Sequence, residues 1–171
     1  MASIFCVQMY CDGSCLANPG PGGWAALLMW QPTTTETSTK NVQPGWGTNN
    51  LAKNHSKLLC GHERHTTNNR MELTAAIEGL SALKCPCGVQ VFCDSQYVVK
   101  GITEWVSSWK KRGWKTAAGK PVENQDLWQK LLTTSEQHKV TWRWVKAHAG
   151  NTLNEYVDEQ ARAQAHLASG S

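Results

Sequence analysis

The sequence predicts an α/β fold in which a five-stranded mixed β-sheet is flanked by helices. The first reason is an almost unbroken apolar run at residues 4–11, closed by Asp12 and Gly13, which is typical of a strand buried on both faces. The second is the order of the segments. Three β-type runs come first, and later runs alternate with stretches of helical periodicity, as in sheets that combine hairpins with crossover helices.

Composition limits the class of protein. The chain has 171 residues, a net charge of +4 and 40% apolar residues, which suits a single globular domain, expected over 1–168 with a disordered tail at 169–171. No run approaches the roughly 18–20 apolar residues of a membrane span, and the N-terminus lacks the features of a secretory signal. Three of the seven cysteines lie in strand-like runs, as free thiols do. We therefore expect a cytoplasmic monomer with no membrane contact.

The first elements form a hairpin. Strands are expected at residues 4–14 and 24–30, around a glycine-rich turn at 20–23. That turn lacks the Gly-Lys-Ser/Thr ending of a phosphate-binding loop. Residues 33–64 are polar and form a long insertion or loop, with a short third strand expected within 56–65.

The later elements alternate. Helices are expected where apolar residues recur at helical spacing, over 68–84, 96–108 (in two pieces around Gly101), 123–137 and 152–168. Two further strands, rich in β-branched and aromatic residues, are expected at 89–93 and 140–145.

Four acids come from separate elements of this scheme. Asp12 and Asp94 follow strands, whereas Glu72 lies in the first turn of a helix and Asp158 in the last helix. Each has an ordinary alternative role. Asp12-Gly is a common turn dipeptide, and Asp94 with Ser95 could form a helix N-cap. Glu72 could close a capping box begun by Asn69, and Asp158 could form an ion pair on the helix surface.

The combination of the four acids favours one shared site, because ligand sites of α/β sheets lie at strand ends. Four acids gathered there repel one another unless cations neutralise them. Hard oxygen ligands at this density suit Mg²⁺ or Mn²⁺ rather than zinc.

Five segments closely resemble the motifs of type 1 ribonuclease H, in the same order. They are DGSCLANPGPGGW (12–24), TNNRMEL (67–73), DSQYVVKGITEW (94–105), WKKRGWK (109–115) and VKAHAGNTLNEYVDEQAR (145–162). The resemblance covers nearly the whole chain and implies the ribonuclease H-like fold. It also implies an endoribonuclease, acting as a stand-alone catalytic domain, that hydrolyses the RNA strand of RNA–DNA hybrids and leaves 5′-phosphate and 3′-hydroxyl ends.

The resemblance also implies roles for individual residues. Asp12, Glu72, Asp94 and Asp158 resemble the four acids that bind two Mg²⁺ ions, with Mn²⁺ as an alternative. His148 resembles a loop histidine associated with proton transfer or product release. The residues that resemble substrate contacts are Cys15, Asn18, Asn68, Asn69, Gln96, Trp109, Lys110, Lys111, Arg112, Trp114 and Lys115. The last six form a basic, aromatic segment that we expect to follow the phosphate backbone of the hybrid.

Phosphodiester hydrolysis develops negative charge on both the attacking and the leaving oxygen, and two divalent ions can stabilise both. We expect Asp12 to bridge the ions. Asp94 and Asp158 are expected on the side that activates water, and Glu72 on the side of the leaving group.

Alternatives remain for the other residues and for the function. Cys60, His62, His65, Cys85 and Cys87 could bind zinc, but their spacing is unusual for zinc, which favours unliganded side chains. The chain could also be a strand transferase on the same scaffold, or a nucleic-acid-binding module without catalysis. The basic segment and the histidine loop argue against the first, and uncompensated acids, which repel phosphate, argue against the second.

Overall fold

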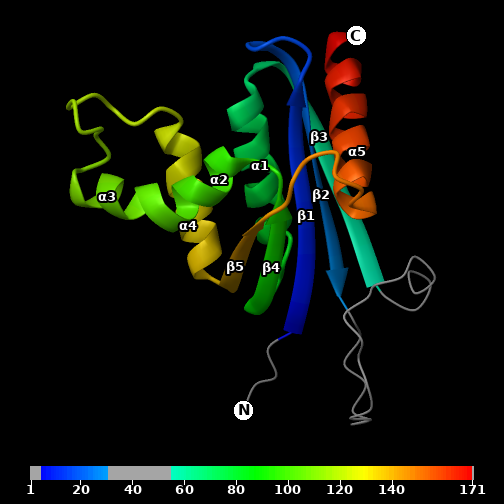
Figure 1. Cartoon of the computed structure of the whole chain (residues 1–171), viewed down its shortest axis with the longest axis horizontal. Coiled ribbons are helices and arrows are strands. Elements are labelled where there is room, and N and C mark those ends of the chain that lie inside the picture. Colours follow the sequence, from blue (N-terminus) through cyan, green and yellow to red (C-terminus); the bar gives the residue numbers. More distant parts are fainter. Residues whose placement is uncertain (1–4, 31–54, 171) are drawn as a thin grey trace.

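The computed structural model describes residues 5–30 and 55–170. Five strands form one mixed sheet in the order β3-β2-β1-β4-β5, with β1 at its centre (Figure 1). The first strand, β1, is antiparallel to β2 and parallel to β4, and β4 is parallel to β5. The strands span Phe5–Cys15 (β1), Gly20–Trp30 (β2), His55–Thr66 (β3), Cys87–Cys93 (β4) and Lys139–Trp144 (β5). The predicted α/β fold with a five-stranded mixed sheet is therefore confirmed.

Helices cover both faces of this sheet. They span Asn68–Ser81 (α1), Gln96–Lys100 (α2), Gly101–Trp105 (η2, a π-helical segment), Val106–Lys111 (α3), Gln125–Glu136 (α4) and Thr152–Ser169 (α5). One face packs against α1, which in turn contacts α4, and the other face packs against α5 over β1, β2 and β3 (Figure 1).

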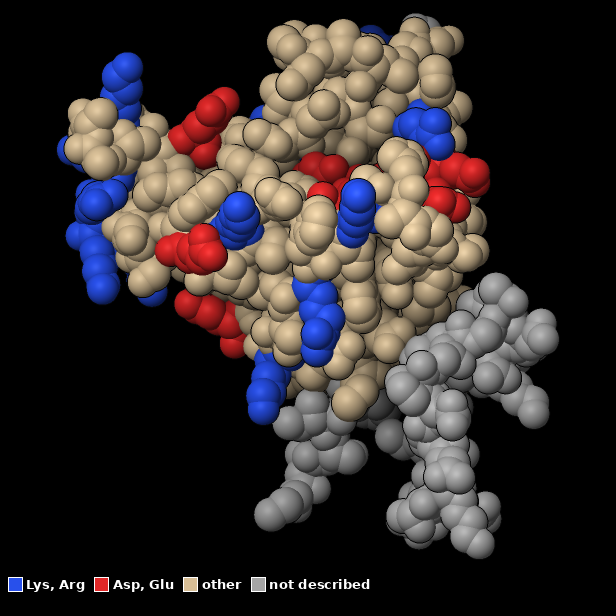
Figure 2. All heavy atoms as spheres, viewed as in Figure 1, with Lys and Arg blue, Asp and Glu red and all other residues tan. Residues whose placement is uncertain are grey.

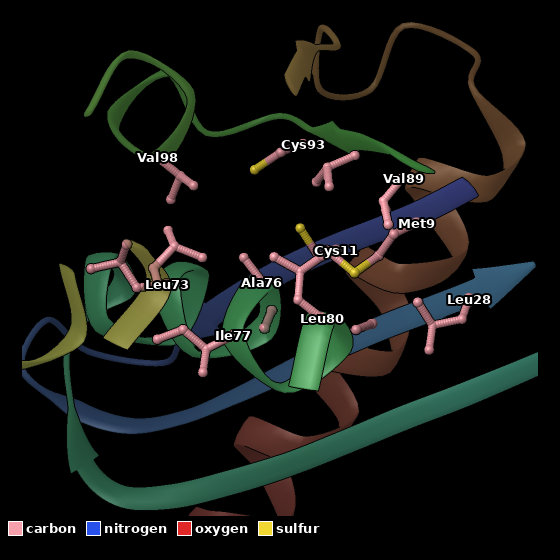
Figure 3. Packing of buried hydrophobic residues seen from close by; sticks show 14 of the residues in the cluster. Met9, Cys11, Leu28, Leu73, Ala76, Ile77, Leu80, Val89, Cys93 and Val98 are labelled. Atoms are coloured by element: carbon pink, nitrogen blue, oxygen red, sulfur yellow. The ribbon is translucent and has the colours of Figure 1, made fainter. Parts of the chain in front are cut away.

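The alternation of side chains along β1 explains the nearly unbroken apolar run at residues 5–11. Met9 and Cys11 point to the α1 face, where they pack with Leu73 and Leu80 (Figure 3). Tyr10 points to the α5 face and belongs to the second apolar cluster. Successive residues of a strand face opposite sides, so a strand between two helical layers needs apolar residues at both.

The glycine-rich segment differs from the turn that the sequence predicts at 20–23. Strand β2 already begins at Gly20, and the bend lies in residues 16–19. A side chain at Gly23 would collide with the backbone of α5 at Ala161, so this glycine permits the close approach of helix and strand.

Two further segments, β3 and the C-terminal residues, also differ from the sequence prediction. β3 has 12 residues and is longer than the short strand expected within 56–65. Most of its side chains are exposed because it is an edge strand, which explains why its sequence lacks an apolar run. The first part of the predicted insertion, residues 33–54, lies outside the described residues. The disordered tail expected at 169–171 is wrong for its first two residues, because Ser169 ends α5 and Gly170 caps it, and Ser171 lies outside the described residues.

The helical stretch after β4 is divided at Gly101, as expected, but into three pieces that continue to Lys111. A side chain at Gly101 would collide with the buried indole of Trp128 from α4. A glycine is therefore required where these two helical segments meet.

Candidate active site

Two neighbouring parallel strands place Asp12 and Asp94 side by side. Cys11 of β1 is paired with Cys93 of β4, and each cysteine is followed directly by one of the acids. Asp12 is buried, with 3% of its surface exposed, and its Oδ1 accepts a hydrogen bond of 2.9 Å from the backbone N–H of Gly13. The same strand edge thus fixes both carboxylates.

The second turn of α1, rather than the first turn as predicted, brings Glu72 to the same edge. Thr67 caps this helix and accepts a 3.2 Å hydrogen bond from the N–H of Arg70, so the capping box suggested for Asn69 and Glu72 is wrong. The helix passes so close to β1 that a side chain at Gly13 would collide with the backbone of Glu72. Glu72 Oε2 is buried and has no hydrogen-bond partner, which indicates a missing positive partner.

The N-cap predicted as an alternative at Asp94 and Ser95 is present, but Ser95 and not Asp94 provides it. The cap of α2 is Ser95, which accepts a hydrogen bond of 3.2 Å from the N–H of Val98. The indole Nε1 of Trp144 donates to the backbone carbonyl of Asp94 at 3.0 Å. Burial raises the pKa of Asp94, whereas the buried Asn154 of α5, beside its carboxylate, lowers it.

Asp158 reaches the site from the opposite face of the sheet, on α5. Its carboxylate forms an ion pair of 3.0 Å with Arg162, one helical turn further on, so the surface-pair alternative holds as well. Asp158 nevertheless lines the same pocket as the other three acids, a recess of about 420 Å³. The two roles are compatible because 19% of its side chain is exposed.

The carboxylates form a tight cluster. Ligand oxygens of Asp12, Glu72 and Asp94 all lie within 4.8 Å of one another. Burial, and then the charge of Asp94, raise the pKa of Asp12 to about 8. Burial, and then the charge of Asp12, raise the pKa of Glu72 well above its usual value. Crowded carboxylates with raised pKa values and an unpartnered buried oxygen fit a hard divalent cation, which would neutralise them.

Some of the residues predicted to contact the substrate lie in or beside the acidic pocket. Cys15, Asn68 and Asn69 line the acidic pocket. Asn18 lies beside it, since its Oδ1 accepts a 3.2 Å hydrogen bond from the N–H of Asn68. Gln96 is exposed in the first turn of α2, next to the pocket residue Ser95.

The loop between β5 and α5 carries His148, which is exposed and has a φ of +55°, a value uncommon outside glycine. Its neighbour Ala147 lines the acidic pocket, but His148 is not among the residues that do. The structure therefore places His148 at the rim rather than within the carboxylate cluster.

The basic segment 109–115 projects away from the sheet. Figure 2 shows Lys and Arg gathered on the side where α3 lies, and acidic atoms at the centre of the view. The four cations of the segment, Lys110, Lys111, Arg112 and Lys115, are exposed. The backbone of Lys115 forms an isolated antiparallel β-bridge with that of Pro121.

The two tryptophans of this segment are half-buried. Trp109 packs against Trp105 and Trp128, with ring centroids 5.9 and 5.5 Å apart. The N–H of Trp114 donates to the Trp109 carbonyl at 2.7 Å. Both indoles therefore anchor the segment, while its charges face solvent.

The structure gives no zinc site among the described residues. Cys60, His62 and His65 lie on edge strand β3, whereas Cys87 begins β4 and Cys85 precedes it by two residues. In residues 5–30 and 55–170 the only group of three metal-ligating side chains is the carboxylate cluster. All seven cysteines are free thiols, as expected.

Sequence reasoning missed two residues of the site, Trp144 and Asn154. Both act on Asp94 from elements distant in the chain. Alternation along β5 could have indicated that Trp144 ends a strand parallel to β4, but no local pattern marks Asn154, which is 2% exposed, as buried.

A mixed sheet with an acidic, cation-compatible cluster at its strand ends defines the class of the protein, an α/β nuclease of the metal-dependent kind. The family model of RNase H matches residues 6–166. The chain belongs to the RNase H family and is an endoribonuclease that cleaves the RNA strand of RNA–DNA hybrids.

Relatives of known name support this assignment. The chain is 51% identical over 159 residues to Ribonuclease HI of Xylella fastidiosa (strain 9a5c), covering 93% of this chain and 91% of that protein. It is 52% identical over 155 residues to Ribonuclease H of Pseudomonas putida (strain W619), covering 91% of this chain and 90% of that protein.

Solved structures show the same fold. The crystal structure of LC9-RNase H1, a type 1 RNase H with the type 2 active-site motif, superposes with a TM-score of 0.80 at 32% identity, covering 98% of this chain and 75% of that chain. The crystal structure of LC11-RNase H1 in complex with RNA/DNA hybrid superposes with a TM-score of 0.59 at 18% identity, covering 95% of this chain and 99% of that chain. At this identity the similarity supports only the shared fold. Within residues 5–30 and 55–170, every helix is too short or too polar to cross a bilayer.

Proposed function

We propose that the acidic pocket hydrolyses the RNA strand of an RNA–DNA hybrid with two Mg²⁺ ions, for which Mn²⁺ can substitute, and leaves 5′-phosphate and 3′-hydroxyl ends. The observation that carries the proposal is the convergence of three carboxylates within 4.8 Å, one of them with a buried oxygen that has no partner. Asp12, Glu72, Asp94 and Asp158 would hold the ions. Bound divalent ions supply charge neutralisation and lower the pKa of an attacking water.

The residues around the acids hold these carboxylates in place. The N–H of Gly13 fixes one oxygen of Asp12 at 2.9 Å. The indole N–H of Trp144 holds the backbone of Asp94, and the buried Asn154 lowers the pKa of its carboxylate. Such fixed geometry spares the reaction the reorganisation that mobile ligands would need.

Substrate contacts surround this centre. Cys15, Asn68 and Asn69 line the pocket and would meet the strand near the scissile phosphate, together with Asn18 and Gln96 beside it. Distinguishing RNA from DNA requires contact with a 2′-hydroxyl, which amide side chains can both donate to and accept from.

The outer contacts would fix the hybrid more loosely. Exposed cations of the segment 109–115 would bind phosphates of the second strand and release counterions. His148, at the rim, would assist proton transfer or product release. Because it lies outside the carboxylate cluster, its role is secondary to theirs.

A substrate panel tests the proposed function. A labelled RNA–DNA hybrid, duplex DNA and duplex RNA of the same sequence are incubated with the protein in Mg²⁺, beside Asp94→Asn and a charge-matched surface control, Asp126→Asn. We expect cleavage of the RNA strand of the hybrid alone, lost in Asp94→Asn and kept in Asp126→Asn. Cleavage of duplex RNA at a similar rate, or full activity of Asp94→Asn, would refute the proposal.

A further inference from the structure

The connector between α1 and β4 carries two thiols that lie outside the active site. Cys85 lies in the bend after α1, and Cys87 is the first residue of β4. Their Sγ atoms are 4.0 Å apart, and the thiol of Cys87 donates a hydrogen bond of 3.1 Å to the backbone carbonyl of Cys85. The two sulfur atoms therefore lie side by side, with Pro86 as the one residue between them in the chain.

The backbone is fixed at one of these cysteines and free at the other. Cys87 is held by its pairing with β1 and by a hydrogen bond of 3.1 Å from its N–H to Nδ1 of His138. Cys85 belongs to neither a helix nor a strand, and it is exposed. A disulfide requires the two sulfur atoms to approach to about 2.0 Å. Movement of Cys85 and its connector can supply that approach while the sheet stays in place.

The two thiols also differ in their access to solvent. Cys85 is exposed, whereas only 4% of the surface of Cys87 is exposed. Burial, and then the hydrogen bond to Cys85, raise the pKa of Cys87 to about 11, so this thiol is protonated in neutral solution. Because the thiolate is the attacking species, an oxidant in solution reacts first at Cys85. Cys87 then lies beside the newly formed bond, in the position of a resolving thiol.

The other exposed or neighbouring cysteines are placed differently. Cys6 lies on the adjacent strand β1, but its register partner is Gly88, so it projects from the opposite face of the sheet to Cys87. Cys11 and Cys93 are register partners, but both are completely buried, which keeps an oxidant out. Cys60 is exposed on β3, which β2 and β1 separate from β4. Oxidation is thus directed to the pair on the connector.

We propose that Cys85 and Cys87 form a reversible thiol–disulfide pair, which a small disulfide such as oxidised glutathione oxidises. The Cys85 thiolate attacks the S–S bond of the oxidant, forms a mixed disulfide and releases one glutathione. Cys87 then loses its proton to solvent, attacks Sγ of Cys85 and releases the second glutathione. Two protein thiols become one disulfide while one glutathione disulfide becomes two thiols, so electrons and protons balance.

The resulting bond should be easily reduced again. A disulfide between cysteines separated by one residue closes a small ring, and strained or exposed disulfides have more oxidising potentials than structural ones. The pair is therefore a dithiol while reduced glutathione is abundant, and it becomes a disulfide when reduced glutathione is depleted. Asp94 follows the opposite end of β4, so the bond forms away from the carboxylate cluster.

Equilibration in glutathione buffers tests the proposal. The protein is incubated at several ratios and total concentrations of oxidised and reduced glutathione, and free thiols are then alkylated. Trypsin releases residues 85–100, which contain Cys85, Cys87 and Cys93, for mass spectrometry. We expect a peptide that lacks the hydrogens of two thiols and carries one alkyl group, located on Cys93 by fragmentation.

Dilution distinguishes the protein disulfide from a mixed disulfide with glutathione. Formation of the protein disulfide releases two glutathione molecules for each one consumed. At a fixed ratio of oxidised to reduced glutathione, tenfold dilution of the buffer should therefore raise the ratio of disulfide to dithiol about tenfold. A mixed disulfide releases one glutathione for each one consumed, so its amount would not respond.

Variants locate the pair. Cys85→Ser should remove the disulfide, and Cys87→Ala should stop the reaction at a mixed disulfide on Cys85. Cys60→Ser, which removes an exposed thiol on β3, should leave the disulfide unchanged. Because Cys85 is exposed, its variant tests the pair even if the variant at buried Cys87 does not fold.

The thiol measurement does not depend on cleavage, so its failure and the failure of the proposed nuclease function are distinguishable. A mixed disulfide on Cys85 alone, or a disulfide between other cysteines, would overturn the proposal. So would a disulfide that does not respond to dilution, or one that persists in Cys85→Ser.

Discussion

Replacing Asp12 with asparagine should abolish cleavage and yet stabilise the metal-free protein at alkaline pH. Burial and Asp94 raise the pKa of Asp12 from 3.8 to about 8. Because the folded pKa is above the unfolded value, this group favours folding fully only below about pH 3.8, and its contribution is lost as the pH rises through about 8. In the Asp12→Asn variant, the amide oxygen would keep the hydrogen bond from Gly13 and the side chain would carry no charge.

The size of the effect follows from the width of this pH window. One pH unit between the two pKa values is worth about 1.4 kcal/mol, so between pH 5 and pH 8 the variant should gain up to about 4 kcal/mol in free energy of unfolding relative to the parent protein. Guanidinium unfolding in EDTA at both pH values measures this difference. Added Mg²⁺ should stabilise the parent protein and have little effect on the variant.

The control for this experiment has the opposite sign. Arg70 holds the pKa of Asp126 below its usual value, so Asp126→Asn should lose stability at neutral pH, and the loss should shrink as the pH falls. If Asp12→Asn and the parent protein show parallel pH profiles in EDTA, the account of a crowded carboxylate cluster is refuted.

The remaining predictions concern the outer residues. His148→Ala should slow turnover severalfold or more in steady-state assays while leaving some activity, because the histidine lies at the rim; damage equal to that of Asp12→Asn would contradict this ranking. Replacing Lys110, Lys111 and Arg112 together with alanine should weaken hybrid binding, measured by fluorescence anisotropy. The affinity for the hybrid should also depend less steeply on salt concentration, because fewer counterions are released. An unchanged salt dependence would place the phosphate contacts elsewhere.

The parts of the fold that could be predicted are those where local pattern and burial agree. β1 is apolar at nearly every position up to Cys11 because both of its faces are covered, and its sequence alone indicated a central strand. β3 is an edge strand with mostly exposed side chains, so no pattern fixed its length. The start of β2 was missed because the glycines that permit α5 to approach the sheet resemble a turn in sequence.

The same distinction applies to the site. Asp12 and Asp94 could be placed together because each directly follows an apolar run that indicates a strand. In the structure the parallel pairing of β1 with β4 stops just before the two acids, although β1 itself continues to Cys15. The local alternatives for Glu72 and Asp94 were settled only by the observed caps, Thr67 and Ser95. Tertiary partners such as the indole of Trp144 leave no trace in local sequence, since they depend on how distant strands align.

The dependence of the cleavage rate on free Mg²⁺ tests the central claim most directly. The rate of cleavage of a labelled hybrid is measured while EDTA buffers the free ion from trace to saturating concentrations. Two ions held by the acids predict no cleavage without metal and an initial rise with about the second power of the free concentration. Cleavage that persists in excess EDTA would contradict the role of the carboxylate cluster, and a strictly first-power rise would contradict the second ion.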